Sequence, residues 1–207
     1  MHLEVLKQPQ IELLPLLKLF RYRFYMAGGT AIALHLGHRY SLDFDLFSYS
    51  SFRNASLKNL LHKHGFFIQQ ILYEDSTQLN CLVNGVKLTF YQYPYAIEPQ
   101  CSLPKVIKLP NILTLAAMKA LALGGRGKWK DYMDLYHILN GHYRLHDVTA
   151  HANDLFGGAF NEKLFRQQLA YYDDVSFEEE VELIGNAIAP EDIKAYLTDL
   201  ALTPFSV

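Results

Sequence analysis

The chain has 207 residues, of which 50% are hydrophobic, and a formal net charge of -2 at pH 7. This length and composition predict one domain, or two small ones, with a sizeable core. A net charge of -2 argues against general electrostatic binding to nucleic acid, so any such contact needs a local basic patch. Neither a secretory leader nor a run of about 18 apolar residues is present, so we expect a cytoplasmic protein that makes no membrane contact.

Residues 1–109 mix strand-like and helix-like segments. Helical periodicity predicts short helices over 30–38 and 55–65. Asn84-Gly85 lies between two strand-like runs and predicts a hairpin, because both residues tolerate the positive φ of a type I′ turn. Alternation of apolar and polar residues predicts strands over 20–28, 41–48, 66–74, 78–83 and 86–95.

Residues 110–207 are almost entirely helical in pattern. Asn111 is a suitable cap for the first helix, and Gly124-Gly125 would end it. Helices are predicted over 112–123, 128–139, 147–156, 161–172 and 190–202. We therefore expect an α+β fold, with a small mixed sheet and its helices in 1–109 and a helical region in 110–207.

Two aspartates, Asp43 and Asp45, are separated by one residue in a predicted strand. Side chains alternate between the faces of a strand, so both carboxylates point the same way. Their repulsion is relieved by a cation, and hard divalent ions such as Mg²⁺ or Mn²⁺ take oxygen ligands of this kind. A polar strand face that only contacts solvent is the alternative.

The Gly28-Gly29-Thr30 turn lies between a predicted strand and a predicted helix. Such a turn offers unhindered backbone N–H groups and the positive end of a helix to a phosphate. Arg39 and Ser41, just ahead of the two aspartates, are further candidates for binding phosphate. An ordinary turn and a surface arginine are the alternatives. Together with a metal site, this cradle supplies what phosphoryl transfer needs.

A second group of charged residues lies in the helical half. Lys119 is at the edge of an apolar helix stripe and needs an anionic partner, for which the triphosphate of a nucleotide is a candidate, or else its stem extends to solvent. Asp131 and Asp134 share a helix face. Around them is a basic run with an aromatic residue, formed by Arg126, Lys128, Trp129 and Lys130. This run predicts either internal salt bridges or a guide for an acceptor such as an RNA end.

Two stretches, GGTAIALHLGHRYSLDFDLF and AAMKALALGGRGKWKDYMDLYHIL, resemble nucleotidyltransferases of the polymerase-beta type, in particular the AbiEii/AbiGii toxin-like branch. The resemblance covers about residues 20–140. It implies the fold of that superfamily, a triphosphate held by the Gly-Gly-Thr turn, and a Mg²⁺ ion on the Asp-x-Asp pair. It also implies an antitoxin protein as a partner. The positions that match are Gly28, Gly29, Thr30, Asp43, Asp45, Lys119 and either Asp131 or Asp134.

The chain departs from this pattern on the strand over 86–95. Related transferases usually carry a third carboxylate there, which deprotonates the attacking hydroxyl. Strand parity places Thr89 at that position. Asp75, Glu98 or the helix aspartates are the candidates for replacing the missing acid.

The function expected from the sequence is transfer of a nucleoside monophosphate from a nucleoside triphosphate to RNA or protein. The missing acid favours a second hypothesis, a catalytically degenerate module that binds a nucleotide or a partner. A metal-dependent phosphohydrolase is the third. The base of the triphosphate, the acceptor and the oligomeric state are left open.

Overall fold

The computed structural model describes residues 1–125, 127–185 and 187–204, and the chain divides into two compact units, Met1–Asn111 and Ile112–Val207. The first unit is built on a mixed sheet, in which seven strands of the described residues pair in the order β3-β4-β5-β2-β1-β7-β6. The strands are β1 (Tyr25–Ala27), β2 (Phe44–Ser48), β3 (Ile68–Glu74), β4 (Gln78–Val83), β5 (Val86–Gln92), β6 (Cys101–Leu103) and β7 (Ile107–Leu109). β1 is antiparallel to β2, whereas β2 and β5 are parallel. The predicted mixed sheet is confirmed.

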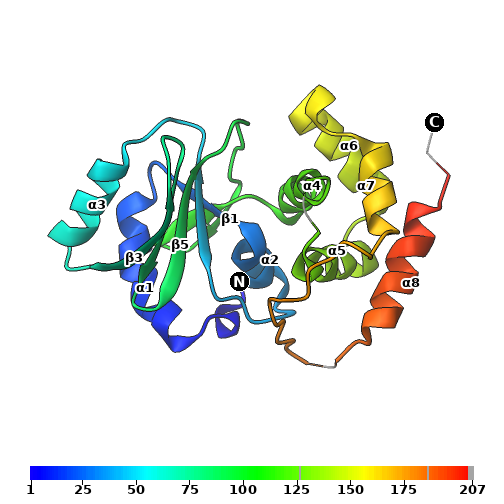
Figure 1. Cartoon of the computed structure of the whole chain (residues 1–207), viewed down its shortest axis with the longest axis horizontal. Coiled ribbons are helices and arrows are strands. Elements are labelled where there is room, and N and C mark those ends of the chain that lie inside the picture. The colour runs from blue at the N-terminus through cyan, green and yellow to red at the C-terminus, as the bar shows by residue number, and fades with distance from the viewer. Residues whose placement is uncertain (126, 186, 205–207) are drawn as a thin grey trace. The chain divides into compact units, whose positions relative to one another are not determined.

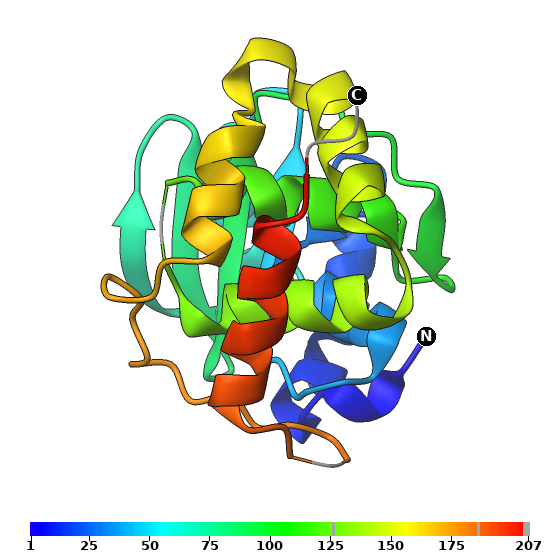
Figure 2. The same cartoon turned by 90° about the vertical axis from the view of Figure 1, so that its right-hand side faces the viewer.

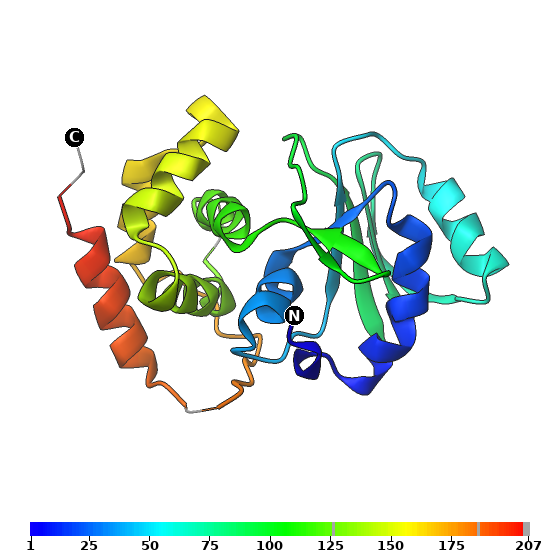
Figure 3. The same ribbon diagram turned by 180° about the vertical axis from the view of Figure 1, so that it is seen from behind.

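Helices cover both faces of this sheet. α1 (Gln8–Phe20) and α3 (Asn54–Lys63) lie on one face, and α2 (Gly28–Leu36) lies on the other (Figure 1, Figure 3). The ring of Phe90 on β5 packs against Phe20 of α1, with centroids 4.9 Å apart. Phe44 and Leu46 on β2 are fully buried, whereas Asp45 between them faces the opposite way. The alternation of β2 therefore places the carboxylate on the side of α2.

Two predictions in this unit have different outcomes. The Asn84-Gly85 hairpin is confirmed, since the two residues have φ of 50° and 72° between β4 and β5. The strand predicted over 20–28 is wrong in its first half, because Phe20 ends α1 and only Tyr25–Ala27 pairs in the sheet. The alternation of aromatic and basic residues does not reflect burial there, since Tyr22 is 87% exposed.

The second unit is helical. Its helices are α4 (Ile112–Leu123), α5 (Trp129–Gly141), α6 (Leu145–Phe156), α7 (Glu162–Leu169) and α8 (Pro190–Ala201). α4 packs against α5, α6 and α7, and α8 packs against α5 and α7. Figure 2 shows α8 crossing α5. The five predicted helices are therefore found, with their ends shifted by a few residues. Within the described ranges, no helix is long and apolar enough to cross a membrane.

Candidate active site

The carboxylate of Asp45 lies very close to the backbone of Gly28, where β1 ends and α2 begins. Gly28 begins α2 with φ of +68°, a conformation that favours glycine. A Cβ added to Gly28 would lie only 2.1 Å from Asp45 Oδ2. The pairing of Ala27 with Asp45 between β1 and β2 sets this approach. The Asp45 carboxylate thus occupies the space that any other side chain at position 28 would need.

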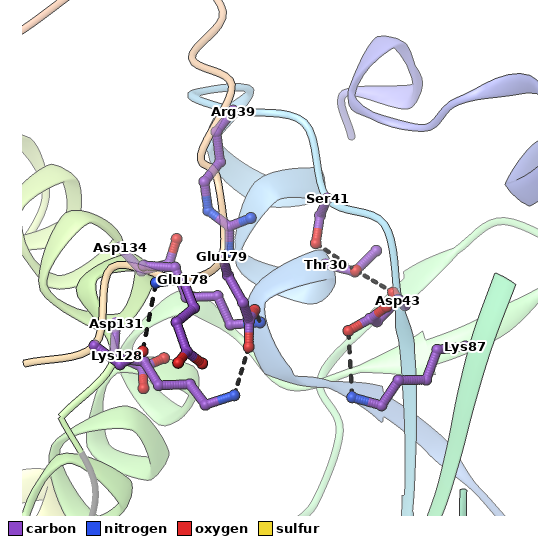
Figure 4. A network of polar contacts seen from close by, with 12 residues as sticks. Thr30, Arg39, Ser41, Asp43, Lys87, Lys128, Asp131, Asp134, Glu178 and Glu179 are labelled. Atoms are coloured by element: carbon purple, nitrogen blue, oxygen red, sulfur yellow. Dashed lines mark hydrogen bonds and ion pairs between the residues drawn. The ribbon is translucent and has the colours of Figure 1, made fainter. Parts of the chain in front are cut away.

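Two hydroxyls fasten the segment before β2 to α2. Thr30 Oγ1 donates a hydrogen bond to the carbonyl oxygen of Asp43, and Ser41 Oγ lies 2.7 Å from Thr30 Oγ1 (Figure 4). Since the proton of Thr30 is used by Asp43, Ser41 is the donor in the second bond. Both side chains are buried. The structure therefore engages the hydroxyls of both residues in positioning Asp43.

The carboxylate of Asp43 has a basic neighbour that we did not predict. Lys87 Nζ on β5 lies 3.6 Å from Asp43 Oδ2, and both side chains are about one third exposed (Figure 4). The signal was present in the alternation of β5, which places Lys87 on the same face as Thr89. This contact shows that a cation can approach Asp43 from the side of β5.

Thr89 stands beside Asp45, where a third carboxylate was expected. The parallel register of β2 and β5 pairs Asp45 directly with Thr89. Asp75 does not replace the acid, because it accepts hydrogen bonds from Thr77 in the turn between β3 and β4. That turn borders Gln92, at the opposite end of β5 from Lys87.

Arg39 and Gly29 complete the set of predicted phosphate-binding residues in this unit. Arg39 is buried, and its Nη1 donates to the carbonyl oxygen of Tyr40 at 3.0 Å. Gly29 is the second residue of α2. The helix has no side-chain hydrogen bond at its N-cap, Ala27. The N–H groups of its first turn are the kind that bind phosphate oxygens.

The residues present fit a divalent metal ion. Mg²⁺ in proteins is usually held by one or two carboxylates and by substrate phosphates. Asp45 supplies a carboxylate next to the backbone of Gly28, and Asp43, whose carboxylate contacts Lys87, is the second candidate ligand. In the part of the chain that the structure describes, no three His, Cys, Asp or Glu side chains form a cluster of their own.

The second unit brings together Lys119, Asp131 and Asp134. Lys119 Nζ on α4 lies 2.6 Å from Asp131 Oδ1 and 2.8 Å from Asp134 Oδ2, both on α5. All three side chains are at least nine-tenths buried. Burial alone lowers the pKa of Lys119, but the attraction of Asp134 and Asp131 outweighs it and raises this pKa above its ordinary value. The anionic partner that Lys119 was expected to need is thus supplied by these two carboxylates.

The basic run near α5 is also engaged by an acid that we did not predict. Glu179 Oε1 lies 2.5 Å from Lys128 Nζ, and Glu179 Oε2 contacts Lys130 Nζ (Figure 4). Trp129 is buried, and its ring stacks on Phe177 with centroids 5.2 Å apart. No local pattern links Lys128 with an acid so far along the chain. Arg126, the first residue of the predicted run, lies outside the described residues.

Comparison with known proteins gives a family and several similar folds. The family model described as "Nucleotidyl transferase AbiEii toxin, Type IV TA system" matches residues 16–204. An uncharacterised protein of Aquifex aeolicus is 33% identical over 125 residues, which is 58% of this chain and 59% of that protein. The match thus spans less than two thirds of that relative.

Among solved structures, MenT4, a nucleotidyltransferase toxin from Mycobacterium tuberculosis, has a TM-score of 0.63 at 15% identity, covering 94% of this chain and 82% of that chain. A candidate nucleotidyltransferase from H. pylori has a TM-score of 0.60 at 16% identity, covering 93% and 90%. These two proteins share the fold of this chain.

Proposed function

Because this chain belongs to the AbiEii family of nucleotidyltransferase toxins, we propose that it transfers a nucleoside monophosphate from a nucleoside triphosphate to an RNA or protein acceptor. The observation that carries this proposal is the close contact between Asp45 and Gly28. A carboxylate is a typical metal ligand, and the backbone N–H groups at the start of a helix bind phosphate. Here the two kinds of group lie next to each other.

Each candidate site residue of the first unit has a role in this proposal. Asp43 and Asp45 hold Mg²⁺ or Mn²⁺, and the N–H groups at the start of α2, from Gly28 and Gly29 onward, bind the triphosphate. Thr30 and Ser41 keep Asp43 in place through the hydrogen bonds described above. When bound, the metal ion would neutralise charge on the triphosphate oxygens. The phosphate contact of Arg39 stays a prediction.

The role of the helical unit in transfer is less direct. Lys119 is predicted to contact the triphosphate, and Asp131 and Asp134 are predicted to take part in catalysis. Their observed partners are one another. These roles stay predictions, and the substitution of Lys119 described in the Discussion tests the contact with the triphosphate.

Thr89 favours a second candidate function. With threonine rather than a carboxylate paired to Asp45, no general base stands at the usual position. A protein of this kind would bind a nucleotide or a partner without transferring anything. The two candidates differ in one measurable respect, because only the first labels an acceptor.

The family description names a type IV toxin–antitoxin system. It supports the proposal that an antitoxin protein is the partner of this chain. Nucleoside triphosphates and RNA are cytoplasmic, and we propose that the protein acts there.

Transfer is tested with the four nucleoside triphosphates, each labelled at the α-phosphate, together with Mg²⁺ and total RNA or protein. We expect label on one acceptor class. Loss of a metal-binding carboxylate removes several kcal/mol of charge stabilisation, so Asp45→Asn should lower the rate by about 100-fold or more. Asp154→Asn, at an exposed position on α6, is the matched control and should leave the rate unchanged.

Label on no acceptor, with Mg²⁺-dependent triphosphate binding retained, would support the binding module instead. If neither label nor binding is found, transfer and nucleotide binding are both wrong, and only the partner-binding form of the second candidate is left.

A further inference from the structure

A cavity of about 470 Å³ lies in the first unit at the far end of β1 and β2 from Gly28. Because these strands are antiparallel, the residues that enter β1 and those that leave β2 meet at this end. The hairpin of β6 and β7 forms the remaining wall. The floor is apolar and buried, with Phe24, Leu103 and Ile107. A cavity of this volume is within the range of sites for small ligands.

The rim of this cavity is strongly cationic. Its lining includes Arg21, Arg23, Lys105 and Lys108, all exposed, and no acidic residue. Among the described residues, none of these four side chains forms an ion pair with a carboxylate. The whole chain has a net charge of -2, so the four positive charges form a local patch. Such a patch attracts an anion, and arginine in particular binds phosphate with two hydrogen bonds.

Tyrosines provide a second feature, and one of them, Tyr22, is itself joined to the cationic rim: the guanidinium of Arg21 lies 4.5 Å from the centroid of its ring and donates to its hydroxyl. Tyr22 is 87% exposed and Tyr49 is 60% exposed, and both line the cavity. Exposed aromatic rings next to cations are typical platforms for nucleic-acid bases. Tyr25 also lines the cavity, and its buried hydroxyl has no hydrogen-bond partner among the residues that the structure describes. Buried hydroxyls are rarely left without a partner, so this one points to a missing ligand.

We propose that this cavity binds one nucleotide unit, with its phosphate on the arginine and lysine rim and its base on an exposed tyrosine ring. The unit comes either from a free nucleotide or from an RNA strand, because both carry the same phosphate and base. The site needs neither a metal ion nor a triphosphate, so it goes beyond the proposed transfer reaction. The five residues of β2, Phe44–Ser48, separate it from Asp43 by about 16 Å, at about 3.3 Å per residue.

The test measures binding without transfer. A fluorescein-labelled single-stranded RNA of ten nucleotides is titrated by anisotropy, and AMP is titrated by calorimetry, both in EDTA. The full chain carrying Arg21→Glu and Lys108→Glu should bind roughly 10- to 100-fold more weakly, as expected for charge-assisted hydrogen bonds. For RNA, the slope of log K against log salt should become shallower by about 0.7 for each phosphate that the variant no longer binds.

The two ligands identify the source of the nucleotide. Weaker binding of AMP as well as RNA indicates a site for a free nucleotide, and weaker binding of RNA alone indicates a strand; either result supports the site. Tyr49→Ala should weaken binding about fivefold or more, and Tyr49→Phe should bind as the wild type does, because the ring supplies the stacking. Both titrations are made in EDTA and measure binding alone, so failure of the transfer proposal leaves this test intact.

Lys63→Glu is the matched control, since Lys63 is an exposed lysine on α3 that does not line the cavity. An equal effect in this variant would overturn the proposal, because it would show a general charge effect. Unchanged binding in the double variant, or no binding by the wild type, would also overturn it. Thermal unfolding checks the fold, and Arg21→Gln with Lys108→Gln replaces the double variant if charge reversal unfolds the protein.

Discussion

A side chain at position 28 would destabilise the protein in two ways, through backbone strain and through collision with Asp45. Comparison with Gly65 separates the two effects. Gly65 has a similar φ of +79°, but a Cβ there would meet nothing within 4 Å. Gly65→Ala should therefore lower the free energy of unfolding by about 1–2 kcal/mol through backbone strain alone. Gly28→Ala should cost about 1–3 kcal/mol more, because it also displaces the carboxylate of Asp45.

Urea unfolding of both variants gives the two free energies, and calorimetry with Mg²⁺–ATP gives the binding. Triphosphate binding should fall in Gly28→Ala only. Equal effects of the two substitutions on stability and binding would show that the contact with Asp45 contributes nothing to triphosphate binding.

At position 89, a substitution restores the missing acid. Thr89→Asp places a carboxylate beside Asp45, where a general base typically contributes about 10²- to 10⁴-fold to the rate. We expect a partial gain in label transfer. Three neighbouring carboxylates repel one another, so thermal stability is measured in parallel, with Thr89→Asn as the uncharged control. A slower rate in Thr89→Asp than in Thr89→Asn would show that another residue supplies the base.

At this scale, the sequence predicted what depends on strand parity. Asp45 and Thr89 could be assigned to one face because alternation is a local property, and the two residues pair in the sheet. The strand predicted over 41–48 begins only at Phe44, so Asp43 lies ahead of β2 and its place on that face stays a prediction. That Lys87 contacts Asp43 depends on the register between β2 and β5, which alternation alone does not specify. The pairing of Glu179 with Lys128 depends on how a long irregular segment folds back, for which no periodic signal exists.

Between α4 and α5, the charge of Lys119 is balanced by two buried carboxylates. Lys119→Met removes the cation and leaves both acids without compensation, so it should lower the free energy of unfolding by about 3–5 kcal/mol. Adding Asp131→Asn and Asp134→Asn should restore most of this stability. Urea unfolding measures the stability, and calorimetry with Mg²⁺–ATP measures the affinity in the restored variant.

The affinity in that restored variant decides between two roles for Lys119. The predicted contact with the triphosphate requires binding to weaken by about 1.5–3 kcal/mol, as for a charge-assisted hydrogen bond. Normal affinity in a stable variant would leave Lys119 with a structural role only.

The irregular segment between α7 and α8 is fastened to α5 by Glu179. Burial raises the pKa of this carboxyl, but hydrogen bonds from Lys128 and Lys130 outweigh burial and bring it to about 2. A lowered pKa in the folded state stabilises the protein above the ordinary pKa of about 4.5, and this contribution is lost as the pH falls from 4.5 to 2.

Glu179→Gln should therefore be less stable than the wild type at pH 7, by about 0.5–1 kcal/mol, because the pair is partly exposed to solvent. The difference should shrink below pH 4.5. Thermal unfolding at several pH values measures it, and a difference that stays constant down to pH 2 would contradict the assignment.

Among the elements, long periodic segments were predictable and short or interrupted ones were not. The pattern of α4 is unbroken, and its predicted and observed ranges agree. α1 contains Pro15, which normally ends a helix, and it was not predicted. β6 and β7 have three residues each, too few to show alternation. Their place in the sheet depends on pairing with distant strands.

Over the whole chain, hydrogen exchange can locate the response to a nucleotide. With Mg²⁺–ATP, we expect slower exchange at the start of α2 and at the start of β2, because the proposed ligands lie there. If the prediction for Lys119 is right, exchange in α4 also slows. Comparison with Asp45→Asn, which should show neither effect, separates binding from non-specific stabilisation. Slowing confined to residues 1–111 would contradict the contact with Lys119.

The sheet order also determines when β1 can pair with both of its neighbouring strands during synthesis. Tyr25 on β1 pairs with Phe47 on one side and with Lys108 on the other. At about 5–20 residues per second, the ribosome needs roughly 4–16 s after β1 to produce its second neighbour. Until then, β1 is an open sheet edge, which readily associates with other chains. Translation that stops before Leu109 should therefore yield aggregation-prone fragments, so that β1 is paired on both sides only after about half of the 207 residues have been made.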